Sequence, residues 1–304
     1  MAQPPTKPHR AGSRPNSMNP IYATKYQLKV VRWRLRRLSV GLRYGAARLN
    51  STPAVLGNAM PKSGSHLINQ IIQGLPAIGP FVNTGFPPVN RDELNQKQPD
   101  AQVKANLERM LPGDVSYGYV KARPPFISLL TQPGWATVFV LRDPRDMIVS
   151  HVFYAAQMHP GHGMHRYYNE TLQTMEQRIN AAIEGVEQPG SELSPILSKY
   201  EGYLGWLDQP EVLCLRFEEL ILARQAALER LLDFLCQRGF QPQLQREREI
   251  ELLSQAVAPK KSGTFRKGQP GNWREHFSAE NKRVFKSLTG DLLYRLGYEQ
   301  NSDW

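Results

Sequence analysis

The stretch Ala54–His66, AVLGNAMPKSGSH, decides how this chain folds. Its apolar first part predicts a buried strand over 54–60, and the apolar residues from Leu67 to Leu75 recur at helical spacing. A strand that turns into a helix through glycine and serine points free backbone N–H groups at one spot, where the helix dipole adds positive charge. Lys62 adds a full charge, so the turn is predicted to bind an anion. Its spacing differs from the Walker sequence, which argues against a nucleoside triphosphate.

A second stretch, Thr137–His151, reads TVFVLRDPRDMIVSH and has the same strand-to-helix form. Pro144 suits a first helical turn, so Arg142 leaves the carboxyl end of the strand and Ser150 lies two turns into the helix. In an open α/β sheet, ligands bind at that end of the strands. A third stretch, Arg266–Trp273 (RKGQPGNW), combines a basic pair with glycines and predicts a loop that wraps an anion.

The three stretches together resemble the sulfotransferase family that uses 3′-phosphoadenosine-5′-phosphosulfate (PAPS), with a cytosolic-type domain in a bacterial-like member. That family has a Pro-Lys-Ser-Gly-Thr-Thr-Trp-like loop, an Arg and a Ser eight residues apart, and an Arg-Lys-Gly-x-x-Gly-x-Trp loop near the C-terminus. All three occur here in the family's order, from about Ala54 to Gly297. The resemblance implies an α/β, P-loop-like three-layer fold, with a central, mainly parallel sheet flanked by helices.

The resemblance also implies a set of site residues. The phosphosulfate loop would comprise Lys62, Ser63, Gly64, Ser65 and His66. The 3′-phosphate would be held by Arg142, Ser150, Arg266, Lys267 and Gly268. Phe217, near the end of an apolar strand that begins at Val212, would contact the adenine, although core packing is the ordinary role of such a residue. Lys62, His66 and Ser150 are the predicted catalytic residues.

The general base is not assigned by the resemblance. Many cytosolic members carry a histidine after the second strand, where this chain has Tyr119 and Lys121, and members acting on heparan-type chains use a glutamate where this chain has Gln70. His66 is the first candidate by position, and the alternatives are His151 and the loop histidines His159, His162 and His165. We expect no metal, because the loop histidines have no acidic or cysteine partner nearby.

The predicted reaction moves a sulfuryl group from PAPS to a hydroxyl of a carbohydrate, glycolipid or small-molecule acceptor. Because the base is missing, the alternative is a non-catalytic nucleotide-binding protein on the same scaffold. The two cysteines, Cys214 and Cys236, are interpreted as reduced thiols. With no long apolar run and no secretion signal, the chain is predicted to be cytoplasmic.

Positive charge is concentrated at the start of the chain. The net charge is +11, and no Asp or Glu occurs between Met1 and Arg91. Residues 1–24 are predicted to be a disordered tail, residues 25–50 a basic amphipathic helix and residues 51–304 the sulfotransferase domain.

The helix has an apolar stripe formed by Leu28, Val31, Leu35, Leu38, Leu42 and Leu49. Such a helix suits an anionic surface, at the inner side of the membrane. Packing on the core or on a second subunit is the open alternative, and nucleic acid is not expected because no recognition motif accompanies the charge.

Overall fold

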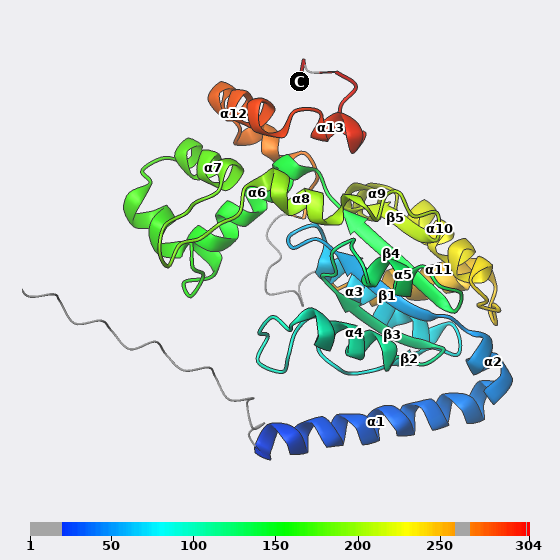
Figure 1. Ribbon diagram of the computed structural model, residues 1–304. Helices are drawn as coiled ribbons and strands as arrows, with labels where there is room; N and C mark the ends of the chain where they lie inside the picture. Colours follow the sequence, from blue (N-terminus) through cyan, green and yellow to red (C-terminus); the bar gives the residue numbers. More distant parts are fainter. Residues whose placement is uncertain (1–19, 259–267, 302) are drawn as a thin grey trace, which may run out of the picture.

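A five-stranded parallel sheet organises the protein. The structure is a computed structural model that describes residues 20–258, 268–301 and 303–304 (Figure 1). The strands are β1 (Ala54–Ala59), β2 (Val82–Asn83), β3 (Asp114–Gly118), β4 (Trp135–Leu141) and β5 (Val212–Arg216). They lie in the order β2-β3-β1-β4-β5, and every neighbouring pair is parallel. The carboxyl ends of β1, β4 and β5 therefore meet at one edge of the sheet.

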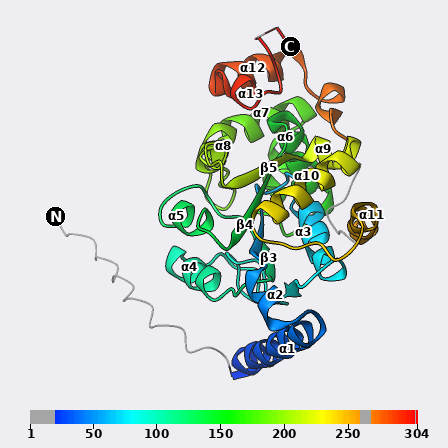
Figure 2. The same ribbon diagram turned by 90° about the vertical axis from the view of Figure 1, so that its right-hand side faces the viewer.

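Helices cover both faces of this sheet (Figure 2). On one face lie α3 (Ser65–Gly74), α10 (Arg224–Gln237) and α11 (Arg246–Ala256), which pack with the strand residues Val55, Val138 and Leu215 in one apolar core. The other face has a second core, built on Leu56 and Phe139. Its helices are α4 (Asp100–Glu108), α5 (Phe126–Leu130), α6 (Pro144–Phe153), α7 (Met175–Glu184), α8 (Ile196–Leu204), α12 (Ala279–Thr289) and α13 (Leu292–Arg295). Because strand side chains alternate between faces, β1 supplies both cores.

The strand predicted to run past Phe217 ends earlier. β5 stops at Arg216, and Phe217 begins helix α9 (Phe217–Leu222). The backbone N–H of Arg216 donates to the carboxylate of Glu219 at 2.9 Å, a capping contact that starts the helix. Phe217 therefore stands at the carboxyl edge of the sheet, where the loops after β1 and β4 also lie.

The basic segment forms two helices where one was predicted over 25–50. Helix α1 spans Pro20–Tyr44 and α2 spans Ala46–Ser51, separated at Gly45, whose φ is 90°. Residues 20–24 of the predicted tail thus belong to α1, and residues 1–19 lie outside the described residues. Helix α1 runs along the β2 edge of the sheet (Figure 1).

Five of the six predicted stripe residues do not pack on the core, which corrects the expectation that the whole stripe would pack there. The sixth, Leu49, lies on α2 and is buried against Trp33 and Val82. Leu28, Val31, Leu35, Leu38 and Leu42 are 51–80% exposed. The opposite side of α1 binds the body: Trp33, only 7% exposed, donates its indole N–H to Asp114 at 3.0 Å, and Arg37 pairs with the same carboxylate at 2.7 Å. No helix in the described part of the chain is long and apolar enough to cross a membrane.

Candidate active site

The loop between β1 and α3 is held by its own backbone. Lys62 and Gly64 both adopt positive φ, 67° and 97°, which turns the chain sharply at the end of the strand. The Ser63 hydroxyl donates to the carbonyl of Met60 at 2.6 Å and lies 3.2 Å from that of Val140, so it fastens the loop to β1 and β4. Ser63 is fully buried and does not line the cavity. Its backbone N–H, which was expected to face the anion, instead donates to the carbonyl of Met60 at 3.2 Å.

The N-terminus of α3 is open to the cavity. Its first residues are Ser65, His66 and Leu67, whose N–H groups have no acceptor in the described part of the chain. The N-cap, Gly64, offers no side-chain acceptor, and the first turn contains no acidic residue. A helix end left in this state is an anion site, because the free N–H groups and the helix dipole act together.

Lys62 lines the same cavity and contacts the face of an aromatic ring. Its Nζ lies 3.7 Å from the ring centroid of Tyr154, a residue on the π-helical turn Tyr154–Met158 at the end of α6. Burial, assisted by the charge of Arg142, lowers the pKa of Lys62 to about 8. An anion bound at the loop would reverse this shift, because it would favour the ammonium form.

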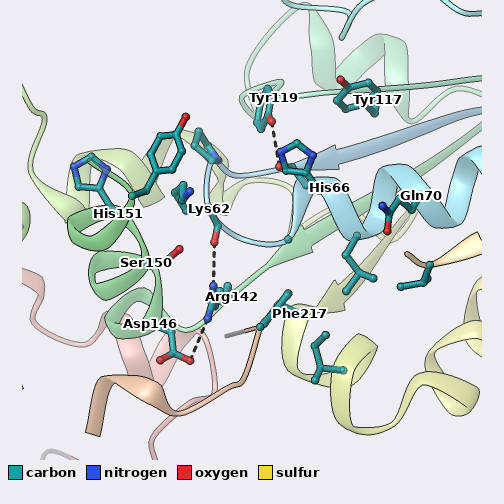
Figure 3. Close-up of a pocket in the computed structure, with 18 of the residues that line it drawn as sticks. Lys62, His66, Gln70, Tyr117, Tyr119, Arg142, Asp146, Ser150, His151 and Phe217 are labelled. Carbon is teal, nitrogen blue, oxygen red and sulfur yellow. Dashed lines mark hydrogen bonds and ion pairs between the residues drawn. The ribbon is translucent and has the colours of Figure 1, made fainter. Parts of the chain in front are cut away.

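Arg142 provides a second cationic centre at the edge of the sheet. It is 8% exposed, donates to the carbonyl of Lys62 at 3.4 Å, and lies 3.7 Å from the carboxylate of Asp146 (Figure 3). The guanidinium carbon stands 4.4 Å from the Phe217 ring centroid. Its Nε is buried without a hydrogen-bond partner in the described structure. A buried guanidinium N–H of this kind needs an acceptor, and a phosphate oxygen in the cavity would supply one.

Asp146 links the C-terminal loop to this centre and was not singled out from the sequence. Its carboxylate accepts the backbone N–H of Gly271 at 2.7 Å and that of Trp273 at 2.9 Å. These bonds place Gly268 and Asn272 in the wall of the cavity. Arg266 and Lys267, the basic pair of the same loop, lie outside the described residues. The role of Asp146 follows only from its contacts with Gly271 and Trp273, which are distant in the sequence. Its local sequence is that of an ordinary helix start.

Phe217 has two neighbours that the sequence did not indicate. A Cβ on Gly64 would lie 2.6 Å from the Phe217 ring, so the ring packs directly on the phosphosulfate-type loop. The other neighbour is the guanidinium of Arg142. Phe217 thus belongs to the core and also lines the cavity, and both expected roles remain compatible with its position.

The cavity has a volume of about 490 Å³ and gathers most of the predicted site residues. The described members of the predicted set that line it are Lys62, Gly64, Ser65, His66, Arg142, Ser150, Phe217 and Gly268. A neighbouring cavity of about 1100 Å³ lies between α1, α4 and the loop after β2. Pro88 and Arg91 line both cavities, so the two spaces adjoin.

Three histidines line the first cavity, and they differ in their ability to accept a proton. Burial lowers the pKa of His151 to about 3. His162 already accepts the N–H of Met164 at its Nδ1, at 3.1 Å. Partial desolvation, with a smaller effect of Lys62, lowers the pKa of His66, a residue that lines the cavity and is still reached by solvent. His159 and His165 do not line this cavity. The described residues contain no cluster of three His, Cys, Asp or Glu able to hold a metal ion.

Comparison with known proteins identifies the class. The family model described as "Sulfotransferase domain" matches residues 53–297, so the chain belongs to the sulfotransferase domain family. A 3-alpha-hydroxysteroid sulfotransferase of Cavia porcellus is 24% identical over 166 residues, covering 50% of this chain and 53% of the relative. The match therefore spans about half the length of that curated relative.

Solved structures show the same fold. Mouse sulfotransferase SULT7A1 complexed with PAP superposes with a TM-score of 0.56 at 15% identity, covering 84% of this chain and 90% of that one. Retinol dehydratase, in complex with androsterone and inactive cofactor PAP, gives a TM-score of 0.53 at 15% identity, covering 84% of each chain. The predicted family and the predicted three-layer parallel fold are confirmed.

Proposed function

We propose that the protein is a sulfotransferase that moves a sulfuryl group from PAPS to a hydroxyl-bearing acceptor. One observation carries the proposal: two cationic centres, at Lys62 and at Arg142, face one cavity at the carboxyl edge of the sheet. The Arg142 Nε has no partner in the described structure. PAPS has two matching anionic groups, the 5′-phosphosulfate and the 3′-phosphate. The PAP complexes of the similar structures favour the same donor.

In this proposal the α3 N-terminus and Lys62 act on the phosphosulfate end. Transfer breaks the bond between the sulfur and the bridging phosphate oxygen and forms a bond from sulfur to the acceptor oxygen. Negative charge grows on the departing phosphate oxygen, and Lys62 with the N–H groups of Ser65 and His66 would stabilise it. Arg142, Ser150, Arg266 and Lys267 would hold the 3′-phosphate, with the guanidinium offering paired donors and lysine a point charge.

His66 is our proposed general base. It lines the cavity beside Lys62, and its lowered pKa keeps the imidazole neutral and able to accept the acceptor's proton near pH 7. His151 lines the cavity as well, but a pKa of about 3 makes it a weak base. The Nδ1 lone pair of His162 already accepts the backbone N–H of Met164. That nitrogen is therefore not available to take the acceptor's proton.

The test of the reaction is transfer of radiolabelled sulfuryl group from PAPS to a panel of steroid, phenol, glycan and glycolipid alcohols. Transfer to any of them, lost in Lys62→Ala, supports the proposal. Binding of PAPS with no transfer across the panel would contradict it.

For the base, pH–rate profiles of His66→Ala, His151→Ala and His162→Ala are compared. We expect the acidic limb to disappear only in His66→Ala, and its disappearance in either other variant would move the base there.

A non-catalytic nucleotide-binding protein is the second candidate, and Gln70 favours it. This residue occupies the position where heparan-type members place a glutamate base. Its side-chain amide exchanges two hydrogen bonds with the backbone of Ala258, each of 3.0 Å, and so serves to hold the chain. Tyr119, after β3, gives its hydroxyl hydrogen to Ser65 at 3.1 Å. Gln70 supplies no base, so the proposed reaction needs one of the histidines that line the cavity, and His66 is the one we propose.

The acceptor and the location of the protein are proposed more broadly. A hydroxyl on a small apolar molecule, a glycan or a glycolipid fits the reaction, and the adjoining cavity of about 1100 Å³ offers room for such a group. We propose a cytoplasmic location, where Cys214 and Cys236, which form no disulfide with each other, would stay reduced.

A further inference from the structure

Helix α1 presents an apolar face that no described residue covers. Its five large apolar side chains, from Leu28 to Leu42, recur at spacings of three and four residues and lie on one side of the helix, over about 21 Å of its length. Each is at least 51% exposed. Isolated exposed leucines are ordinary on protein surfaces, but a continuous stripe of this length marks a docking surface.

Positive charge borders this stripe on both sides. With about 100° between successive residues, Arg32 lies next to Leu28 on one side and Arg34 next to Leu38 on the other. Both arginines are exposed and form no ion pair within the described structure. Arg43, on the same side as Arg32, contacts only the ring of Tyr44 among the described residues. Long cationic side chains flanking an apolar stripe can reach phosphate groups while the leucines enter the acyl layer.

The rest of α1 is fixed to the protein body, which holds this face outward. Trp33 and Arg37 both bind the buried carboxylate of Asp114, and Arg36 donates to the carbonyl of Asn83 at 3.0 Å. The polar and aromatic side of the helix is thus used for folding. The apolar side is left for something outside the described chain.

Charge decides which occupant fits. Helix α1 contains no acidic residue, so a second copy laid against the stripe would bring two rows of arginines together with no carboxylates on either helix to pair with them. A nucleic acid would satisfy the arginines and leave the leucines in water. An anionic bilayer satisfies both, since it offers headgroup phosphates above an apolar layer.

We propose that α1 docks the protein on an anionic membrane surface through its leucine stripe and the flanking Arg32, Arg34 and Arg43. The helix lies in the plane of the interface and does not cross it, in keeping with its length and charge. Docking is independent of turnover, so the proposed reaction and the proposed docking can fail separately.

Vesicle sedimentation of the full-length protein tests the proposal. We expect binding to vesicles of phosphatidylcholine with phosphatidylserine at low salt, weaker binding at high salt, and little binding to pure phosphatidylcholine. The variant Leu35→Ser/Leu38→Ser/Leu42→Ser should lower the partition coefficient by about tenfold or more, because three apolar side chains no longer leave water. Arg32→Glu/Arg34→Glu should weaken binding to anionic vesicles and reduce its salt dependence, with Arg43 left to supply the remainder.

Matched controls separate the stripe from general surface effects. Leu222→Ser/Leu244→Ser/Leu288→Ser removes three exposed leucines elsewhere and should bind vesicles as the wild type does. Arg166→Glu/Arg248→Glu makes the same charge change away from α1. All variants keep residues 1–19, and unchanged circular dichroism and thermal midpoint verify folding. Wild-type protein that ignores anionic vesicles, or stripe variants that bind fully, would overturn the proposal. So would a wild-type dimer that the stripe variant converts to a monomer, since the occupant would then be a second copy.

Discussion

The ammonium nitrogen of Lys62 stands 3.7 Å from the centre of the Tyr154 ring. This contact joins the loop after β1 to the turn that ends α6, two segments about 90 residues apart in the sequence. The ring face stabilises the cation, while burial and Arg142 lower the pKa of Lys62 from 10.5 to about 8. In the free protein Lys62 therefore loses its proton at a lower pH than an ordinary lysine does, and a bound anion would raise its pKa again.

Donor binding should consequently depend on pH. A bound anion raises the pKa of Lys62, so binding above about pH 8 takes up a proton and affinity falls as pH rises. We expect the Kd of adenosine 3′,5′-bisphosphate to rise by up to about tenfold per pH unit above pH 8. Calorimetry in two buffers of different ionisation enthalpy measures the proton uptake directly. Lys62→Met should bind more weakly with a flatter profile, and an equally steep profile in that variant would assign the proton to another group.

Removing the charge of Lys62 should affect turnover more than donor affinity. Charge on the departing oxygen develops in the transition state, so Lys62→Ala is expected to lower kcat by about a hundredfold or more, with a smaller change in donor Kd. Steady-state kinetics and calorimetry on the same preparation give the two numbers. EDTA should leave wild-type activity intact. A Lys62→Ala enzyme with normal turnover, or an enzyme stopped by EDTA, would contradict this scheme.

Arg142 should determine selectivity for a 3′-phosphate. Arg142→Lys keeps a positive charge but loses the paired donors and the guanidinium contact with the Phe217 ring. We expect it to weaken binding of adenosine 3′,5′-bisphosphate by about 1.5–3 kcal/mol while affinity for AMP changes little. Arg230→Lys, at a surface ion pair with Glu219, is the control. Equal losses for both nucleotides would show that Arg142 does not contact the 3′-phosphate.

Gly64 should be required for two separable reasons. Its φ of 97° is strained for any other residue, and an added Cβ would lie 2.6 Å from the Phe217 ring. Gly134 has a similar φ of 88°, but its Cβ would meet nothing within 4 Å. Gly134→Ala therefore reports backbone strain alone, of about 1–2 kcal/mol. Gly64→Ala should destabilise more and also weaken donor binding, as measured by denaturant unfolding and calorimetry. Equal unfolding free energies for the two variants would mean that the ring yields freely.

Asp146 should act as a positioning residue for the C-terminal loop. Asp146→Asn keeps one acceptor oxygen for the N–H groups of Gly271 and Trp273, and Asp146→Ala keeps none. Donor KM should rise in the order wild type, Asn, Ala, by about tenfold per lost hydrogen bond to the carboxylate. The kcat at saturating donor should change less. A fall in kcat with unchanged KM would instead indicate direct participation in the reaction.

The fold could be predicted because the first two motifs, Ala54–His66 and Thr137–His151, each span the end of a strand. In a parallel sheet those ends share one edge, so Lys62, Arg142 and Phe217 were expected together before their contacts were known. Strand β2, with two residues, is too short to leave a periodic pattern. The backbone N–H of Ser63 was expected to face the anion, but it donates to the carbonyl of Met60, because the turn closes on itself before the helix begins.

The features that the sequence did not predict depend on contacts between distant segments. Asp146 and Gly271 are 125 residues apart, and no local pattern links them. On α1, periodicity identified the leucine stripe but could not say which side would pack. The buried Asp114 decided it, because its carboxylate needs donors, and Trp33 and Arg37 supply them from the opposite side of the helix.

The two hydrogen bonds of Asp146 also mean that the cavity depends on residues made late in synthesis. The ribosome delivers the chain from its N-terminus, so the Lys62 loop and α6 emerge long before Gly271 and Trp273. Until those residues are made, Asp146 lacks its two backbone donors and the wall formed by Gly268 and Asn272 is missing. A chain that ends before Gly271 therefore lacks one wall of the cavity and cannot enclose a nucleotide.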